Sequence, residues 1–196
     1  SALQNNTTGA NNVAVGTSAL SANTIGTHNV AVGFNALSSN TTGGLNTALG
    51  GNSLYSNTIG IYSVAVGYSA LYSNTTGFQN TAIGSNSLTS NTTGTSNTGI
   101  GLNSLYSNTT GGNNYAIGQS ALYSNLTSNA NIAIGSVTLN KHTTGDGNIA
   151  IGHNSLFTPH NGGGYNVGIG GSALLNMGSN SSYNTSVGYQ SGNSSG

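Results

Sequence analysis

The sequence predicts an all-β protein that folds as a single β-solenoid, or β-roll, of about eleven coils. Three observations predict this class: a phrase of about 17 residues that repeats along the chain, a glycine at one fixed place in every copy, and two columns of aliphatic residues. A short fixed period is typical of solenoids, in which each repeat is one structural unit that stacks on the next. We expect one β-solenoid repeat domain over residues 1–196, with incomplete coils at 1–11 and 184–196.

The repeat is counted from position 1, which is asparagine in ten of eleven copies. The copies begin at Asn12, Asn29, Asn46, Ser63, Asn80, Asn97, Asn114, Asn131, Asn148, Asn166 and Asn184, an interval of 17 residues eight times and then 18 twice. Their consensus is N-x-A-V/I-G-x-x-A/S-L-x-x-N-T-T-G-x-x. A unit this short has no room for two helices and a turn, so we expect short strands with glycine corners, paired to the next coil at about 4.8 Å.

Two columns are predicted to form the core. Position 4 is always Val, Ile or Leu, and position 9 is leucine from Leu3 to Leu174. Neighbouring residues of a strand point to opposite faces, so the small residue at position 3 is expected to point outward and to form a self-association face. The alternative is a coil so narrow that this column is tucked into a bend. The predicted face consists of Ala14, Ala31, Ala48, Ala65, Ala82, Ala116, Ala133 and Ala150.

The glycine at position 5, from Gly16 to Gly188, predicts a corner that needs a positive φ or leaves no room for a Cβ atom. The NTTG phrase has Asn first and Gly fourth, as a type I turn prefers. Stacked asparagines at position 1 are expected to form hydrogen bonds along the rod. Sequons in the NTTG corner make glycosylation a candidate modification; the alternative is that Asn and Thr are simply good corner residues. The candidates are Asn6, Asn40, Asn74, Asn91, Asn108 and Asn125.

Position 10 carries a column of aromatic residues, which is a candidate ligand stripe for the apolar faces of sugar rings. The alternative is a ladder of stacked rings that stabilises the rod. The stripe consists of Tyr55, Tyr72, Tyr106, Tyr123 and Phe157. Threonines of the NTTG corner form a further column, which makes an ice-binding solenoid a remote alternative.

Only 1% of the residues are charged, and Lys141 and Asp146 are the whole inventory. A single basic residue is too few to form the positively charged surface that nucleic-acid binding needs. The sequence contains no run of 18 apolar residues, so it predicts no membrane-spanning helix. Catalysis needs titratable groups held together, and the chain has one carboxylate, one amine and four histidines. We therefore expect no enzyme, no metal site and no cofactor.

The late coils depart from the consensus. LNKHTTGDG carries both charges, and LFTPHNGGGY adds Pro159 and an extra residue. These segments are candidates for a contact that depends on register, and the loop near Pro159 is a second candidate for recognising glycans.

The phrases NVAVG, NTAIG and NIAIG resemble the head repeats of YadA-type trimeric adhesins, and the chain is similar to repeats of phage tail fibres. This resemblance implies a left-handed β-roll in an extracellular rod, and in the adhesins three rolls packed side by side. The repeat of 17 residues is longer than the usual adhesin head unit.

The expected function is structural: a protomer of an extracellular fibre or surface filament, on a cell surface or a virion. Its expected partner is itself, in a head-to-tail fibre through the solenoid ends or in a side-by-side trimer. The alternative is an adhesin or tail-fibre module that binds cell-surface glycans.

Overall fold

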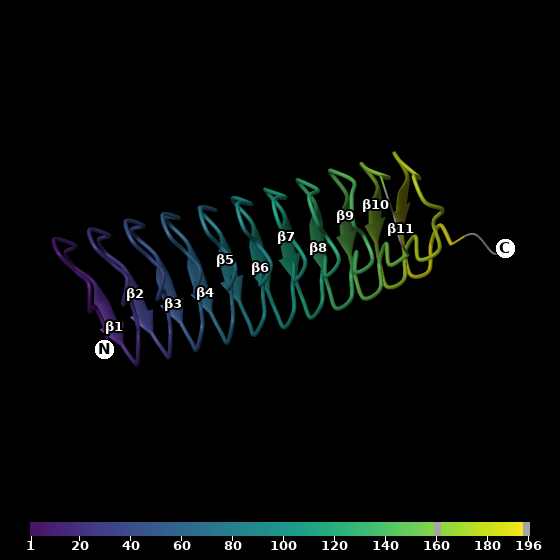
Figure 1. Ribbon diagram of the computed structural model, residues 1–196. Helices are drawn as coiled ribbons and strands as arrows, with labels where there is room; N and C mark the ends of the chain where they lie inside the picture. The colour runs from purple at the N-terminus through teal and green to yellow at the C-terminus, as the bar shows by residue number, and fades with distance from the viewer. Residues whose placement is uncertain (159–161, 194–196) are drawn as a thin grey trace.

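The computed structural model describes residues 1–158 and 162–193. This part of the chain contains no helix, and its strands recur once per coil along a rod (Figure 1). The strands are β1 (Val13–Val15), β2 (Val30–Val32), β3 (Thr47–Leu49), β4 (Val64–Val66), β5 (Thr81–Ile83), β6 (Thr98–Ile100), β7 (Tyr115–Ile117), β8 (Ile132–Ile134), β9 (Ile149–Ile151), β10 (Val167–Ile169) and β11 (Thr185–Val187).

The strands form one 11-stranded parallel sheet in chain order, from β1 to β11. The register joins equal positions of neighbouring coils, for example Ala48 with Ala65 and Leu49 with Val66. The sequence period is therefore the register of the sheet, and the chain is a parallel β-solenoid. Ten steps of about 4.8 Å make the sheet roughly 48 Å long, with β1 and β11 at opposite ends of the rod (Figure 1).

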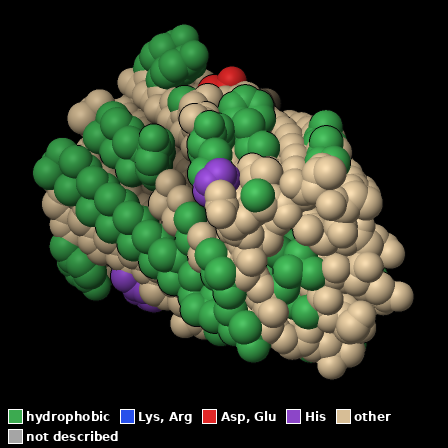
Figure 2. All heavy atoms as spheres, turned by 90° about the vertical axis from the view of Figure 1, so that its left-hand side faces the viewer, with side chains coloured by type: hydrophobic (Ala, Val, Ile, Leu, Met, Phe, Trp, Pro, Cys, Tyr) green, Lys and Arg blue, Asp and Glu red, His purple; other side chains and the backbone are tan. Residues whose placement is uncertain are grey.

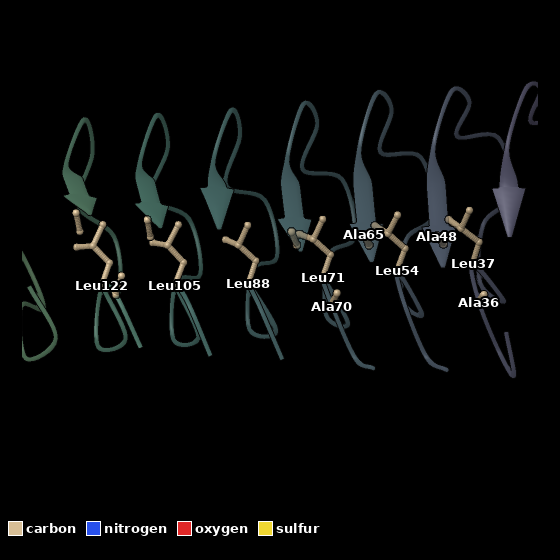
Figure 3. Packing of buried hydrophobic residues seen from close by; sticks show 14 of the residues in the cluster. Ala36, Leu37, Ala48, Leu54, Ala65, Ala70, Leu71, Leu88, Leu105 and Leu122 are labelled. Carbon is tan, nitrogen blue, oxygen red and sulfur yellow. The ribbon is translucent and has the colours of Figure 1, made fainter. Parts of the chain in front are cut away.

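The core is a thin layer between the sheet and the turns that face it. The position-9 leucines from Leu20 to Leu156 are fully buried and stand in a row, and the position-3 alanines of the strands point towards them (Figure 3). Small residues at position 8, such as Ala70 and Ser87, are buried beside the leucines. Position 9 thus lies in the core, as predicted.

The predicted orientation of the strands is wrong. Seven of the eight position-3 alanines are 0% exposed and Ala14 is partly buried, whereas Val15 and Ile83 at position 4 are 56% and 39% exposed. A Cβ atom added to Gly99, a position-3 glycine, would lie 2.6 Å from Ser87 Oγ. The coil is so narrow that position 3 accommodates little more than a methyl group, so the larger side chain of position 4 points outward.

The buried leucines have an unusual backbone. Each position-9 leucine has a φ between 48° and 53°, in the left-handed region. That conformation costs an ordinary residue about 1–2 kcal/mol. Burial of the leucine side chain contributes about 1.5–3 kcal/mol, which offsets this cost.

The position-5 glycines fulfil both conditions predicted for their corner. Gly50 has a φ of 133°, and a Cβ atom there would lie 2.6 Å from the carbonyl oxygen of Gly67 in the next coil. The backbones of neighbouring coils therefore touch at this corner, and alanine does not fit.

Two columns of asparagines connect the coils. At position 12, Asn74 Nδ2 donates to Asn57 Oδ1 (2.9 Å) and to the carbonyl oxygen of Gly77 (2.9 Å). At position 1, Asn46 Oδ1 accepts from the backbone N–H of Ser63 in the next coil (3.0 Å). The predicted hydrogen bonding of stacked position-1 asparagines is confirmed, and position 12 adds a second column.

Candidate functional site

The first candidate is the outer sheet face, which we define as the side chains at positions 2 and 4 of all eleven strands. Position 4 contributes only Val, Ile and Leu, and position 2 contributes Val, Ile, Thr and Tyr115. None of these side chains is fully buried, and Val13, Leu49 and Ile117 are between 40% and 49% exposed. The space-filling view shows hydrophobic side chains gathered in stripes along the rod (Figure 2). The outer sheet face is thus mostly apolar, uncharged and at least partly open to solvent.

The alanines predicted to form the self-association face do not lie on the surface. They line the interior on the opposite side of the same strands. The prediction of a small-residue face is therefore wrong, and the exposed surface of the sheet belongs to positions 2 and 4.

The aromatic column at position 10 is a ladder of stacked rings. The ring centroids of Tyr55 and Tyr72 are 5.0 Å apart with planes at 3°, and those of Tyr106 and Tyr123 are 5.0 Å apart with planes at 2°. Within each pair the facing sides of the rings cover each other, and all four rings are only partly exposed, which leaves little open ring surface for a sugar. The Nζ atom of Lys141 lies over the Phe157 ring, 4.7 Å from the ring centroid, and makes a cation–π contact.

The sequon asparagines belong to the buried position-12 column. Asn40, Asn74, Asn91, Asn108 and Asn125 are 0% exposed, and only Asn6, in the first coil, is exposed. Each buried Nδ2 atom donates hydrogen bonds inside the corner. In the folded chain, the side-chain amides of these five asparagines are therefore not accessible for attachment of a glycan.

The threonines at position 13, the first Thr of NTTG, form hydrogen bonds between neighbouring coils. Thr58 Oγ1 donates to the carbonyl oxygen of Thr75 in the next coil (3.1 Å), and the backbone N–H groups of Thr58 and Ile59 point to the same oxygen. The same side-chain bond recurs at Thr24, Thr41, Thr75, Thr92 and Thr109. These hydroxyl groups link coils, which is a structural role.

The second candidate is a corner trough near the C-terminal end, with a volume of about 500 Å³. It is lined by side chains from four successive coils: Thr127 and Thr144 at position 14, Asn129 and Asp146 at position 16, and Tyr165 and Tyr183 at position 17. The trough lies in the late coils whose sequences depart from the consensus. Pro159 itself lies outside the described residues.

The titratable side chains are spread over the rod. His153 is exposed at position 6 and Asp146 is exposed at position 16. His142 is buried at position 12, where its Nε2 atom lies 2.7 Å from the carbonyl oxygen of Gly145 and replaces the contact that asparagine makes elsewhere. Within residues 1–158 and 162–193, no three His, Asp or Glu side chains are placed to hold a metal ion. The same residues include no helix suited to crossing a membrane.

No protein-family model matches the sequence, and the comparisons with curated proteins and with solved structures find no significant match. The fold therefore defines the class by itself: the chain is a parallel β-solenoid of about ten turns, built from a 17-residue repeat. The likeness to trimeric adhesin heads and phage tail fibres rests on the repeat phrase alone.

Proposed function

We propose that the chain is a structural protomer of an extracellular fibre or surface filament, and that copies associate side by side through the outer sheet face. The observation that supports this proposal is the aliphatic column at position 4, which runs over all eleven strands and is exposed in seven of them and partly exposed in the other four. Contiguous apolar patches of this kind are rare on monomeric proteins and mark sites of association.

The best partner for this surface is a second copy of the chain. The outer sheet face repeats at the spacing of the strands, about 4.8 Å, and a second copy presents the same columns at the same spacing. Side chains of two parallel copies therefore meet coil for coil along the whole rod. A face that packs on the same face of a second copy closes as a two-fold dimer. The resemblance to adhesin heads implies a trimer instead, in which three outer sheet faces are turned towards a three-fold axis. Both are closed oligomers of one size.

Low charge agrees with this function. A rod with one Lys and one Asp has no charge pattern to oppose lateral packing or to hold the outer sheet face in water. The other route to a fibre is head-to-tail stacking of copies through the solenoid ends. Such stacking yields an open series of oligomer sizes, whereas side-by-side association yields one closed oligomer.

The test is sedimentation velocity of the full chain and of two charged double variants. We expect the wild type to form one discrete oligomer, and the variant with Ile83→Lys and Ile117→Lys to be monomeric with an unchanged circular dichroism spectrum. The matched control carries Ile59→Lys and Ile61→Lys, at exposed corner positions, and should remain oligomeric. A wild type that is monomeric at its highest soluble concentration, or an open series of sizes, contradicts the proposal.

A further inference from the structure

The corner trough lies where polar or small residues follow one another at position 16. The last four complete coils carry Asn129, Asp146, Gly164 and Ser182 there. In the earlier coils the same column varies, with bulky Ile61 and Phe78 in two coils and Thr27, Gly44, Thr95 and Gly112 in the others. No large apolar side chain therefore occupies position 16 in the four coils that line the trough.

The extra residue of the late coils falls in the chain segment that leads into this corner. In regular coils the position-1 Nδ2 atom donates to a carbonyl oxygen 14 residues ahead, as from Asn131 to Gly145. In the next two coils the same bond spans 15 residues, from Asn148 to Gly163 and from Asn166 to Ser181. Because Leu156 and Leu174 keep their places in the core, the insertion lies between position 9 and position 15. In both coils the longer segment thus directly precedes residues that line the trough, Gly164 and Ser182.

The floor of the trough consists of the polar residues Asn129, Asp146 and Ser182, and hydrogen bonds hold these side chains in place. Asp146 Oδ1 accepts from the backbone N–H of Asn129 (2.7 Å), and Asn129 Oδ1 accepts from the backbone N–H of Gly112 (2.8 Å). Ser182 Oγ accepts from the backbone N–H of Gly164 (3.1 Å). The bond to Asp146 engages one carboxylate oxygen, which leaves the second as an acceptor for a ligand. Polar groups that are fixed in advance reduce the ordering cost of binding.

The aromatic side of the trough is also built into the fold. The rings of Tyr165 and Tyr183 are stacked at 5.5 Å with planes at 5°, and they are 58% and 80% exposed. A Cβ atom at Gly147 would lie 2.8 Å from the Tyr165 ring, so the ring packs on bare backbone. The result is an aromatic platform beside the chain's single carboxylate.

From these observations we infer that the corner trough binds a hydroxyl-rich, uncharged oligosaccharide. Its volume of about 500 Å³ falls within the range of about 300–1,000 Å³ typical of small-molecule sites. Carboxylate, amide and hydroxyl groups on the floor suit sugar hydroxyl groups, and a Tyr ring suits the apolar face of a sugar ring. A lipid tail would leave the polar floor without partners, and a phosphate group would meet Asp146. This site is independent of the outer sheet face and adds recognition to a structural rod.

The experiment measures binding of the full chain to an array of defined oligosaccharides, followed by titration of the bound probes into isotope-labelled protein. We expect binding to at least one uncharged oligosaccharide, with a shift of the Asn129 backbone amide signal, because this N–H bonds to Asp146. Tyr183→Ala and Asp146→Asn should weaken binding about tenfold, the equivalent of roughly one stacked ring or one charge-assisted hydrogen bond. Asparagine at residue 146 retains an oxygen for the Asn129 N–H, so the floor stays folded.

Matched controls use the same columns outside the trough. Tyr62→Ala changes an exposed position-17 tyrosine, and Thr42→Trp changes an exposed position-14 threonine; both should bind like the wild type. Thr144→Trp fills the trough and should abolish binding. The inference is overturned if no uncharged oligosaccharide binds, if binding survives Tyr183→Ala, Asp146→Asn and Thr144→Trp, or if only amine-bearing probes bind.

Discussion

At the scale of single residues, the fold depends on side chains that match the space inside a narrow coil. Position 3 takes alanine, glycine or, in the last strand, Ser186, and position 9 takes leucine in a left-handed conformation in every coil from Leu3 to Leu174. Position 5 takes glycine because the next coil lies against it. His142 shows that a column tolerates a substitute which reproduces one contact, since its Nε2 atom meets the carbonyl oxygen of Gly145 as an asparagine Nδ2 atom does.

Two adjacent glycines test this account of the corner. Gly50 has a φ of 133° and would place a Cβ atom 2.6 Å from the backbone of the next coil, whereas at Gly51 the nearest atom, Tyr68 Cδ2, is 3.5 Å away. We expect Gly50→Ala to lower the free energy of unfolding by about 3 kcal/mol more than Gly51→Ala, through strain at a positive φ and overpacking. Thermal unfolding followed by circular dichroism measures the difference. Equal losses in the two variants would show that the corner is looser than described.

At the scale of the element, each coil is one three-residue strand and a set of turns, and little of it is stable alone. The bonds that connect coils come from the parallel sheet, the threonine carbonyl groups and the two asparagine columns. Buried polar columns stabilise a structure only while every member has its partners. From Asn23 to Asn125 the position-12 column meets this condition, because each Nδ2 atom has an amide oxygen and a carbonyl oxygen to bond.

The position-12 column makes a prediction at Asn74. Asn74→Ala removes the donor to Asn57 Oδ1 and the acceptor of Asn91 Nδ2, both of which are buried. Each unsatisfied buried group costs about 1–3 kcal/mol, so we expect a loss of at least about 3 kcal/mol in the free energy of unfolding. Thr76→Ala, an exposed change in the same corner, should cost less than about 0.5 kcal/mol. Denaturant unfolding gives both values, and similar losses would rule out a stabilising role for the column.

At the scale of the whole molecule, one rod carries two surfaces of opposite character. The outer sheet face is mostly apolar and runs over all eleven strands, which suits association with further copies of the chain. The corner trough is polar and local, which suits a small ligand. The two surfaces lie on different parts of the coil, so one rod can both assemble and bind.

The outer sheet face predicts how assembly responds to salt. It contains no charged side chain, so we expect the association constant to change less than about threefold between low and molar sodium chloride, because screening has no ion pair to weaken. Sodium sulfate should strengthen association, because it favours burial of apolar surface. Sedimentation equilibrium at graded salt concentrations measures both effects. Dissociation by sodium chloride would instead place Lys141 or Asp146 in the interface.

Several features were predictable because they depend on periodicity alone. The interval of the repeat equals the register that joins Ala48 with Ala65, and the unvarying glycine marks the corner at Gly50. The asparagine at position 1 was predicted to bond along the rod, and it does. The stacked tyrosines were predicted as one of two alternatives, and the ring geometry matches the ladder.

Other features were not predictable from the pattern. Alternation along a strand shows that Ala82 and Ile83 point to opposite faces, but not which face is the interior. The prediction placed the larger side chain of position 4 in the core and the alanine of position 3 outside, which is the reverse of the structure. The repeat pattern does not give the distance across the coil, and that distance decides which side chain fits inside. The corner trough depends on small residues from four coils, and no single phrase indicates that they enclose a space.

The period, the parallel stacking and the class of fold thus follow from the residue pattern alone, because equal spacing places equal residues above one another. Which side of each strand meets water follows instead from the width of the coil. The coil is so narrow that it admits a leucine from one wall and little more than a methyl group from the other. That width places the aliphatic column on the outer surface, where the proposed assembly occurs.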